Sequence, residues 1–303
     1  MIRFAWLILL ASVGFAAEPA VDIDSAARIY QAAAVREQVR ASLGSMPAQI
    51  RSLFAHDAAA QLSEPQLAAV SAASVRGFRI DVFEAPALRA LALNLDPVTV
   101  TKSLAFLDSD LGKRMVAADV AAATMGEENI DKVMNGEITA PSTPKRDAII
   151  AKLEAATHST ESTVQVFLSM GQAVAIGTAI GSGQDPVAVA ERTRKSSEAS
   201  RVELENNLRI PMRRFMSYSY RNLSDSDLKH LLAFLDSPTG KKYVAAYNAA
   251  MDAGFDAMGK RTGEQLGESL RELAEAQLDA AGMTRAPPSA APPEAPPTPA
   301  SPQ

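Results

Sequence analysis

The sequence of 303 residues contains no cysteine, three histidines and 5% aromatic residues, with a single tryptophan. Without cysteine, disulfide bonds and thiolate metal sites are excluded, so the fold must be stabilised by its hydrophobic core. His56, His158 and His230 lie far apart and have no metal-ligand spacing, and no H-E-x-x-H motif occurs. We therefore expect no metal site and no cofactor.

Catalytic motifs are also missing. The sequence has neither the G-x-S-x-G turn of serine hydrolases nor a complete P-loop. A Ser-His-Asp triad can be assembled from distant parts of any chain of this length, so the presence of those residue types is not evidence. We therefore predict no catalytic residue and expect no enzymatic activity. A hydrolase whose site has no recognisable motif remains an alternative.

Positive charge is in short supply, because 30 Lys and Arg residues stand against 35 Asp and Glu residues. Arg213, Arg214 and Arg221 lie close to Phe215 and Tyr218, an arrangement that resembles a nucleic-acid-binding patch. The acidic balance and the export signal described next argue against that interpretation. We expect no nucleic-acid partner.

The N-terminus has the pattern of a secretory signal peptide, predicted at residues 1–17. Arg3 provides the charged start, residues 5–13 form a short apolar core, and small residues follow up to the predicted cleavage near Ala16 or Ala17. The apolar core is too short to span a bilayer. The protein is therefore expected to be exported, and most simply to be periplasmic.

Signals for β-strands are absent. There is no run of alternating β-branched residues and no Asn-Gly or Asp-Gly hairpin signal, whereas alanine, leucine and methionine are plentiful. This composition predicts an all-α fold. Eight of the 18 prolines lie within residues 286–303, which predicts an extended, disordered tail rich in proline and alanine.

The most informative feature is an internal repeat. The segment Asn222–Ala246 has a copy at Asn94–Ala118, 128 residues earlier, and the copies share Leu-Ala-Phe-Leu-Asp-Ser, Gly-Lys and Val-Ala-Ala. A long self-match at one offset indicates a duplicated unit. Each copy predicts a helix, a tight corner and a second helix. Asp96 and Ser224 are predicted to cap the first helix in each copy.

The corner of each copy carries a glycine, Gly112 or Gly240, in the first turn of the second helix. Glycine there costs roughly 0.5–1 kcal/mol relative to alanine. The favoured explanation is that the helices cross too closely for a side chain. A weaker alternative is an anion site at the helix N-terminus, formed with Lys113, Lys241 and Lys242. The residues predicted to build the two corners are Phe106, Asp108, Ser109, Gly112, Phe234, Asp236, Ser237, Pro238 and Gly240.

These features predict two tandem helical-bundle modules. The predicted boundaries are a signal peptide at 1–17, a first module at 22–137, a linker at 138–145, a second module at 146–283 and a tail at 284–303. Pro141 and Pro144 mark the linker.

Individual helices are predicted from caps, breakers and periodicity. The first helix is expected to be capped by Asp24 or Ser25 and to run beyond Val39 towards Ile50. A second is expected from Glu64 to Ile80. The other predictions are a break at 81–87, a short helix at 87–93, a helix end at Gly126 to Glu128, a polar helix at 185–217 and a last helix at 262–280.

The segment Ser162–Gln184 contains no charged residue, and its length is sufficient to span a membrane. Gln165, Gln172 and several hydroxyl groups lower its hydropathy. We therefore expect a buried core helix followed by a glycine-rich turn, and no stable membrane span in the mature chain. A membrane-inserting or oligomerising segment is the alternative.

The corner resembles the signature of the domain-of-unknown-function family 2059, exported bacterial proteins with an all-helical domain. That signature reads Phe-Tyr-x-Ser-Pro-x-Gly-x-Lys, and Phe234, Ser237, Pro238, Gly240 and Lys242 occupy its positions. In the earlier copy Phe106, Ser109 and Gly112 match, the proline is lost and Arg114 replaces the lysine. The resemblance implies an exported helical protein and supplies no activity.

The sequence therefore predicts an exported helical protein that binds or scaffolds in the cell envelope without catalysis. The expected partner is an unknown envelope protein or a small ligand, and a homo-oligomer is possible. The alternative is a carrier of a small apolar ligand, in a pocket lined by Phe106, Met115, Met251 and Phe255. For the hydrolase alternative, His158 or His230 would need to face a carboxylate in a cleft.

Overall fold

A computed structural model describes residues 20–44 and 63–280, and within these ranges most residues are helical. Within these ranges no strand is formed, so the predicted all-α class is confirmed. The predicted signal peptide, His56 and the Pro/Ala tail lie outside the described residues. The helices before residue 140 are α1 (Ile23–Ala32), α2 (Val35–Leu43), α4 (Glu64–Gly77), α5 (Ile80–Asn94), α6 (Pro97–Leu107), α7 (Asp110–Ala123) and α8 (Glu127–Asn135). Those after it are α9 (Pro144–Thr157), α10 (Ser159–Ser182), α11 (Pro186–Ser219), α12 (Asp225–Asp236) and α13 (Pro238–Ala280).

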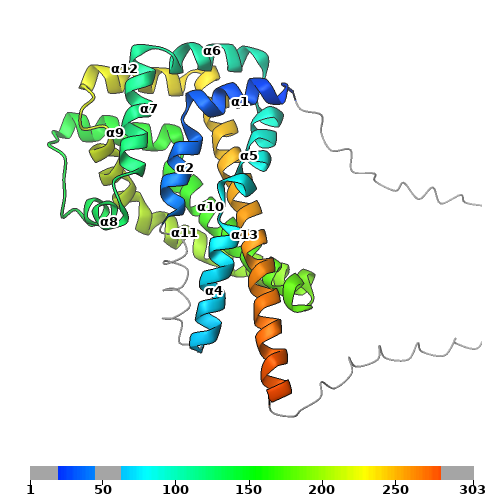
Figure 1. Ribbon diagram of the computed structural model, residues 1–303. Helices are drawn as coiled ribbons and strands as arrows, with labels where there is room; N and C mark the ends of the chain where they lie inside the picture. Colours follow the sequence, from blue (N-terminus) through cyan, green and yellow to red (C-terminus); the bar gives the residue numbers. More distant parts are fainter. Residues whose placement is uncertain (1–19, 45–62, 281–303) are drawn as a thin grey trace, which may run out of the picture.

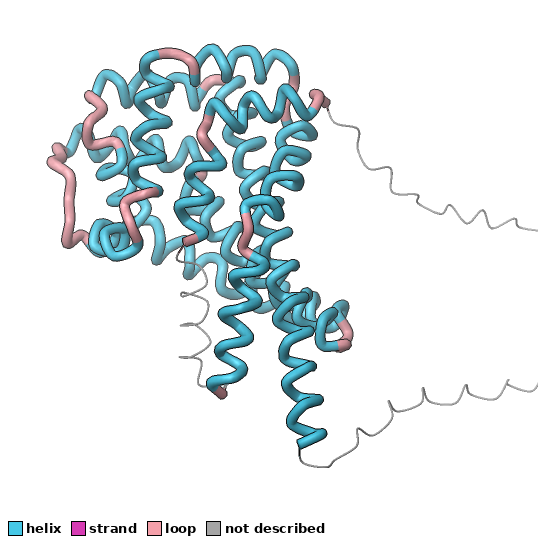
Figure 2. Tube along the Cα trace, viewed as in Figure 1, coloured by secondary structure: helices cyan, strands magenta, loops and turns pink. Residues whose placement is uncertain are grey.

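Most helices form a compact head, from which α4 and the C-terminal part of α13 extend side by side (Figures 1 and 2). Helix α13 runs from the head to the tip of this extension. A small hydrophobic cluster of Val70, Ala73 and Leu266 joins the two extended helices.

The main hydrophobic core draws on both halves of the chain. Leu91 and Leu104 from the first half belong to the same buried cluster as Leu153, Leu228 and Met258 from the second half. The two halves therefore share one core, a question that the sequence leaves open. The boundaries of the two predicted modules stay a prediction.

Helix caps follow the sequence signals closely. Asp96 accepts a hydrogen bond from the backbone N–H of Thr99, and Pro97 takes the first helical position. Ser224 and Asp227 form a reciprocal capping box at the start of α12. Both predicted caps of the repeated helices are therefore confirmed.

Several predicted helix boundaries are wrong. The first helix is capped by Asp22, not by Asp24 or Ser25. It does not continue towards Ile50, because Ala34 adopts a left-handed conformation with φ of 50° and separates α1 from α2. Glu127 begins α8, where a helix end is predicted.

Two helices are longer than predicted. The predicted break at 81–87 does not occur, because α5 continues through Pro86 from Ile80 to Asn94. The predicted last helix at 262–280 is the end of α13, which is 43 residues long. The polar helix predicted at 185–217 is confirmed as α11, and the helix from Glu64 ends at Gly77.

Helices α10 and α13 pack backbone against backbone along a row of glycines. A Cβ atom added to Gly177 or Gly181 would overlap the backbone of α13, and one added to Gly263 or Gly267 would overlap the backbone of α10. Glycine therefore sets the distance between these two helices.

The uncharged segment forms α10, followed by Gly183 in the left-handed conformation. Its packing against α13 agrees in part with the predicted core helix, yet 28% of its most apolar window is buried and Phe167 is 51% exposed. By length and composition α10 is the one helix in residues 20–44 and 63–280 that could cross a membrane. Core helices of soluble proteins can have the same length and apolar composition.

The glycine row predicts opposite effects for two substitutions to alanine. Gly263→Ala places a methyl group against the carbonyl oxygen of Val174 and is expected to lower the free energy of unfolding by about 1–3 kcal/mol. Gly171→Ala in α10 has no atom within 4 Å of the new methyl group and is expected to raise that free energy by about 0.5–1 kcal/mol. Denaturant unfolding followed by circular dichroism measures both. Equal effects of the two substitutions would contradict the backbone contact.

Candidate functional site

The two corners have the same local geometry. Ser109 Oγ accepts a hydrogen bond from the Gly112 N–H at 3.1 Å and donates one to the Phe106 carbonyl oxygen at 2.5 Å. Ser237 makes the equivalent bonds with Gly240 and the Phe234 carbonyl oxygen at 3.0 and 2.6 Å. A Cβ on either glycine would overlap that same carbonyl oxygen, so the close helix crossing accounts for glycine. Asp108 is the C-cap of α6, Asp236 ends α12 and Pro238 begins α13.

The corners also contact each other. The rings of Phe106 and Phe234 stack with their centroids 3.9 Å apart and their planes 3° from parallel. Two ion pairs flank this stack: Arg114 binds Asp227, at the start of α12, at 2.7 Å, and Lys242 binds Asp96, the cap of α6, at 2.7 Å.

These ion pairs are reciprocal. Arg114 and Lys242 occupy equivalent positions in the repeat, and each pairs with the first helix of the other copy. This approximates the contact pattern of a two-fold symmetric interface, although the two acidic partners differ by three positions in the repeat. The hydrogen bond from Lys242 lowers the pKa of Asp96 to about 2, and the bonds from Arg114 hold the pKa of Asp227 well below its usual range.

The candidate anion site has no converging donors in this arrangement. The N–H groups of Gly112 and Gly240 donate hydrogen bonds to Ser109 and Ser237. Lys242 is paired with Asp96, and Lys113 and Lys241 are exposed. The anion site stays a prediction.

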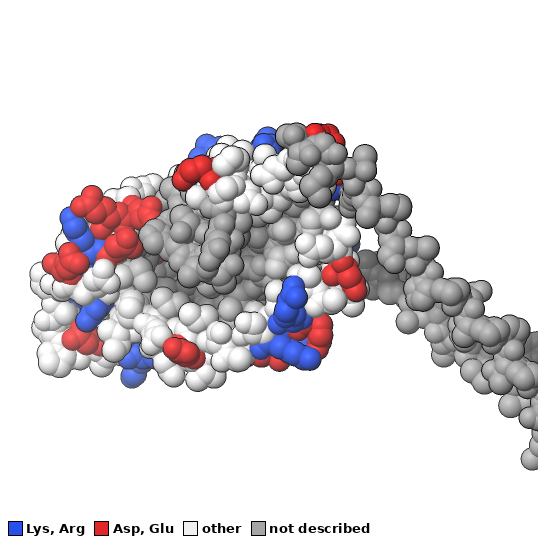
Figure 3. Space-filling view, turned by 90° about the horizontal axis from the view of Figure 1, so that it is seen from below, with Lys and Arg blue, Asp and Glu red and all other residues white. Residues whose placement is uncertain are grey.

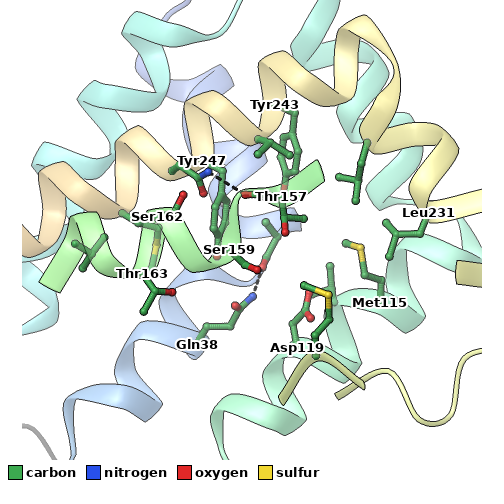
Figure 4. Close-up of a pocket in the computed structure, with 18 of the residues that line it drawn as sticks. Gln38, Met115, Asp119, Thr157, Ser159, Ser162, Thr163, Leu231, Tyr243 and Tyr247 are labelled. Carbon is green, nitrogen blue, oxygen red and sulfur yellow. Dashed lines mark hydrogen bonds between the residues drawn. The ribbon is translucent and has the colours of Figure 1, made fainter. Parts of the chain in front are cut away.

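A cavity of about 520 Å³ lies between the two halves, bounded by α2, α7, α10, α11, α12 and α13 (Figure 4). Equivalent positions of the repeat form its facing walls. The pairs at an offset of 128 residues, from α7 and α13, are Met115 with Tyr243, Val116 with Val244, and Asp119 with Tyr247. Outside the repeated segments, three further pairs of lining residues are each 124 positions apart, from α2 with its preceding residue and from the α9–α10 junction: Ala33 with Thr157, Gln38 with Ser162, and Ser42 with Val166.

Much of the cavity wall is apolar. Met115, Met251 and Phe255, three of the four residues predicted for an apolar pocket, line it. Phe106 does not, because its ring is stacked on Phe234. Leu231 and Leu235 complete the apolar surface. The cavity volume falls in the range of roughly 300–1,000 Å³ that small-molecule sites occupy.

Of the described residues that line the cavity, Asp119 is the one with an acidic side chain, and none of them is basic. Burial raises the pKa of its carboxyl group from 3.8 to about 7, against a hydrogen bond with Tyr220 that lowers it. Burial, together with the nearby Asp119, also raises the pKa of Tyr220 well above its usual value. The pKa values of Tyr243 and Tyr247 are raised chiefly by burial, with Asp119 contributing.

Some of the uncharged polar groups at the cavity have hydrogen-bond partners within the protein, and others do not. Asn248 Nδ2 donates to the Thr157 carbonyl oxygen at 3.1 Å, and Gln38 Nε2 donates to the Ala33 carbonyl oxygen at 2.8 Å. Ser159 Oγ is buried and has no hydrogen-bond partner within the described part of the chain. In Figure 4, Asp119, Ser159, Tyr243 and Tyr247 point towards the same space. The cavity therefore presents a polar end to a ligand.

Other polar clusters are occupied by protein partners. Glu154, fully buried, contacts Arg209 and Arg213 at 3.4 and 3.3 Å and accepts a hydrogen bond from Thr160 at 2.6 Å. A smaller cavity of about 320 Å³ beside the linker is lined by Arg213 and by Arg214, which is bonded to the Met134 carbonyl oxygen at 3.1 Å. Neither cluster leaves a converging set of free groups.

Metal and histidine sites receive no support from the described residues. No group of three or more potential metal ligands occurs among them. His158 and His230 are exposed and line neither cavity. Acidic and basic side chains are interspersed on the face seen in Figure 3, without a large basic surface.

The polar residues of the cavity were missed by sequence reasoning. Asp119 lies within an alanine-rich helix, where an acidic residue is usually exposed. Comparing the two copies one residue beyond Ala118 and Ala246 would have drawn attention to it, because Asp119 there faces Tyr247.

The stacked rings predict an energetic coupling between the corners. In a double-mutant cycle of Phe106→Ala and Phe234→Ala, the combined loss of unfolding free energy is expected to differ from the sum of the single losses by about 0.5–1.5 kcal/mol. A control cycle pairs Phe106→Ala with Phe167→Ala, whose ring is exposed on α10. Additivity in both cycles would exclude the stack.

The raised pKa of Asp119 predicts a pH-dependent stability. Between pH 4 and 7 the folded carboxyl keeps its proton while the unfolded one loses it, so this group makes the protein less stable as pH rises. Asp119→Asn should equal the wild type below pH 4 and be more stable above pH 7, by a few kcal/mol at most. Thermal unfolding across this pH range measures the difference. A difference that is constant with pH would contradict the raised pKa.

Comparison with known proteins places one part of the chain. Residues 216–268, from the end of α11 through α12 into α13, match the family described as "Uncharacterized protein conserved in bacteria (DUF2059)". The match contains the later corner and several cavity residues, and the earlier copy lies outside it. No curated protein matches the chain, and no solved structure matches it. The expected resemblance is thus supported for the second half of the chain.

Proposed function

We propose that this protein binds a small molecule in the cavity between its two halves, as a carrier or receptor and not as an enzyme. The observation that supports this proposal is the cavity of about 520 Å³, whose apolar surface is interrupted by polar side chains that include Asp119 and Ser159. Such a composition is typical of small-molecule sites. Of the two binding roles that the sequence favours, the cavity supports the ligand carrier over the protein scaffold.

We further infer that the first half is a diverged second copy of the family's helical unit. The reciprocal ion pairs and the equivalent cavity walls support this inference. So does the backbone, because Ala34 and His158 are the two non-glycine residues with positive φ in the described ranges, at 50° and 52°. Each separates two helices at the start of its half, α1 from α2 and α9 from α10. The proposed units are the modules 22–137 and 146–283.

The proposed location is the bacterial cell envelope. Residues 1–17 have the composition of a secretory signal, and the matching family is described as conserved in bacteria. Export to the periplasm suits a chain without cysteine, because an oxidising compartment cannot form incorrect disulfides in it. Residues 284–303 are proposed to act as an extended spacer.

Filling the cavity should abolish binding. The probe is N-phenyl-1-naphthylamine, an uncharged apolar dye that becomes fluorescent in apolar sites. We expect one dye molecule per chain, and a decrease in affinity of at least about tenfold for Val116→Trp, whose indole would occupy the cavity.

Val98→Trp is the matched control, because Val98 is 60% exposed on α6 and does not line the cavity. It should bind the dye as the wild type does. Ser162→Trp fills the cavity from the opposite wall and should repeat the loss, and circular dichroism verifies that each variant is folded. If folded Val116→Trp and Ser162→Trp bind as tightly as Val98→Trp, the cavity is not the binding site.

A further inference from the structure

The charge inside the cavity is unbalanced. Asp119 on α7 lies near Tyr220, at the end of α11, and near Tyr243 and Tyr247 on α13. The described residues of α2 and α10 that line the cavity are uncharged. Among residues 20–44 and 63–280, no lysine, arginine or histidine lines the cavity. A carboxylate in such a place is stabilised either by a proton or by a cation brought from outside.

The three tyrosines suit a cation as well. An organic cation is attracted to the face of an aromatic ring by about 0.5–2 kcal/mol. The rings of Tyr243 and Tyr247 lie with centroids 6.2 Å apart on consecutive turns of α13, and both side chains point into the cavity (Figure 4). Ser159 Oγ adds a buried hydrogen-bonding group without a partner in the described chain. Carboxylate, aromatic rings and hydroxyl group therefore gather at one end.

The remaining wall requires an apolar body. Met115, Met251, Leu231 and Phe255 also line the cavity, and burying an apolar group against them contributes roughly 25 cal/mol per Å². A small hydrated ion would leave this surface in contact with water. An organic anion would place its charge against Asp119.

Building on the proposed ligand-binding function, we propose that the cavity binds an amphipathic organic cation, an amine or a quaternary ammonium compound with an aliphatic or aromatic body. The cationic head lies between Asp119 and the tyrosines, and the body lies against the methionines and Phe255.

The test compares three probes built on an eight-carbon chain, on the full mature chain, by isothermal titration calorimetry. Octyltrimethylammonium carries a permanent positive charge, octanol is neutral and octanoate is negative. At pH 8 we expect octyltrimethylammonium to bind at least about tenfold more tightly than octanol, and octanoate to bind most weakly. Asp119→Asn keeps the shape of the side chain and should remove the advantage of the cation over octanol.

The pH dependence gives an independent readout. Because the charge of octyltrimethylammonium does not change with pH, its affinity should rise as Asp119 ionises near pH 7 and level off above it. Tyr220, Tyr243 and Tyr247 do not titrate in this range, because their pKa values are raised above the usual value for tyrosine. In Asp119→Asn the affinity should be independent of pH between 5 and 8.

The outcomes separate the two proposals. Suppose that octanol binds the wild type and that Val116→Trp and Ser162→Trp lose this binding. If the cation then binds no more tightly than octanol, or keeps its advantage in Asp119→Asn, the inference of a cationic ligand is overturned and the binding function stands. If none of the three probes binds the folded wild type, both are overturned. Tighter binding of octanoate than of octyltrimethylammonium would also overturn the cationic ligand.

Discussion

The stacking of Phe106 on Phe234, at 3.9 Å between ring centroids, fixes where the two halves of this protein meet. The serine and glycine of each corner bring the carbonyl oxygens of these same residues against the next helix, so the rings are held by short local contacts. Helices α7 and α13 continue from the corners, and their first side chains to line the cavity are Met115 and Tyr243, three residues after Gly112 and Gly240. The cavity therefore depends on the contact between the corners.

Local signals in the sequence predicted the helical class, the caps of the repeated helices and the polar helix α11. They failed where packing overrides local preference. Pro86 lies inside α5, whose buried Phe83 packs edge-on against Phe255 at 5.3 Å. Gly254 and Gly259 lie inside α13, where a Cβ would overlap Phe83 and the backbone of α10. Local preference disfavours proline and glycine inside a helix, although tertiary contacts make these helices continuous.

The cavity was beyond sequence reasoning for a different reason. Its walls come from helices spread over more than 200 residues, from Ala33 to Phe255. The apolar side chains could be predicted because hydrophobic periodicity marks the buried face of each helix. The position of Asp119 could not be predicted in this way, because the pattern of a single helix does not show whether a polar residue faces solvent or a cavity between the two halves of the chain.

The proposed duplication within one chain would explain why the acid occurs once. In a two-fold symmetric dimer, an aspartate at the position of Asp119 would be present twice and would place two carboxylates in one cavity. Two such like charges raise each other's pKa and favour the protonated form. In a single chain the copies diverge independently, and Tyr247 stands where the second aspartate would be. One wall then supplies a single negative charge and the other an aromatic face, so the asymmetry between the copies matches a ligand with one positive charge and one apolar side.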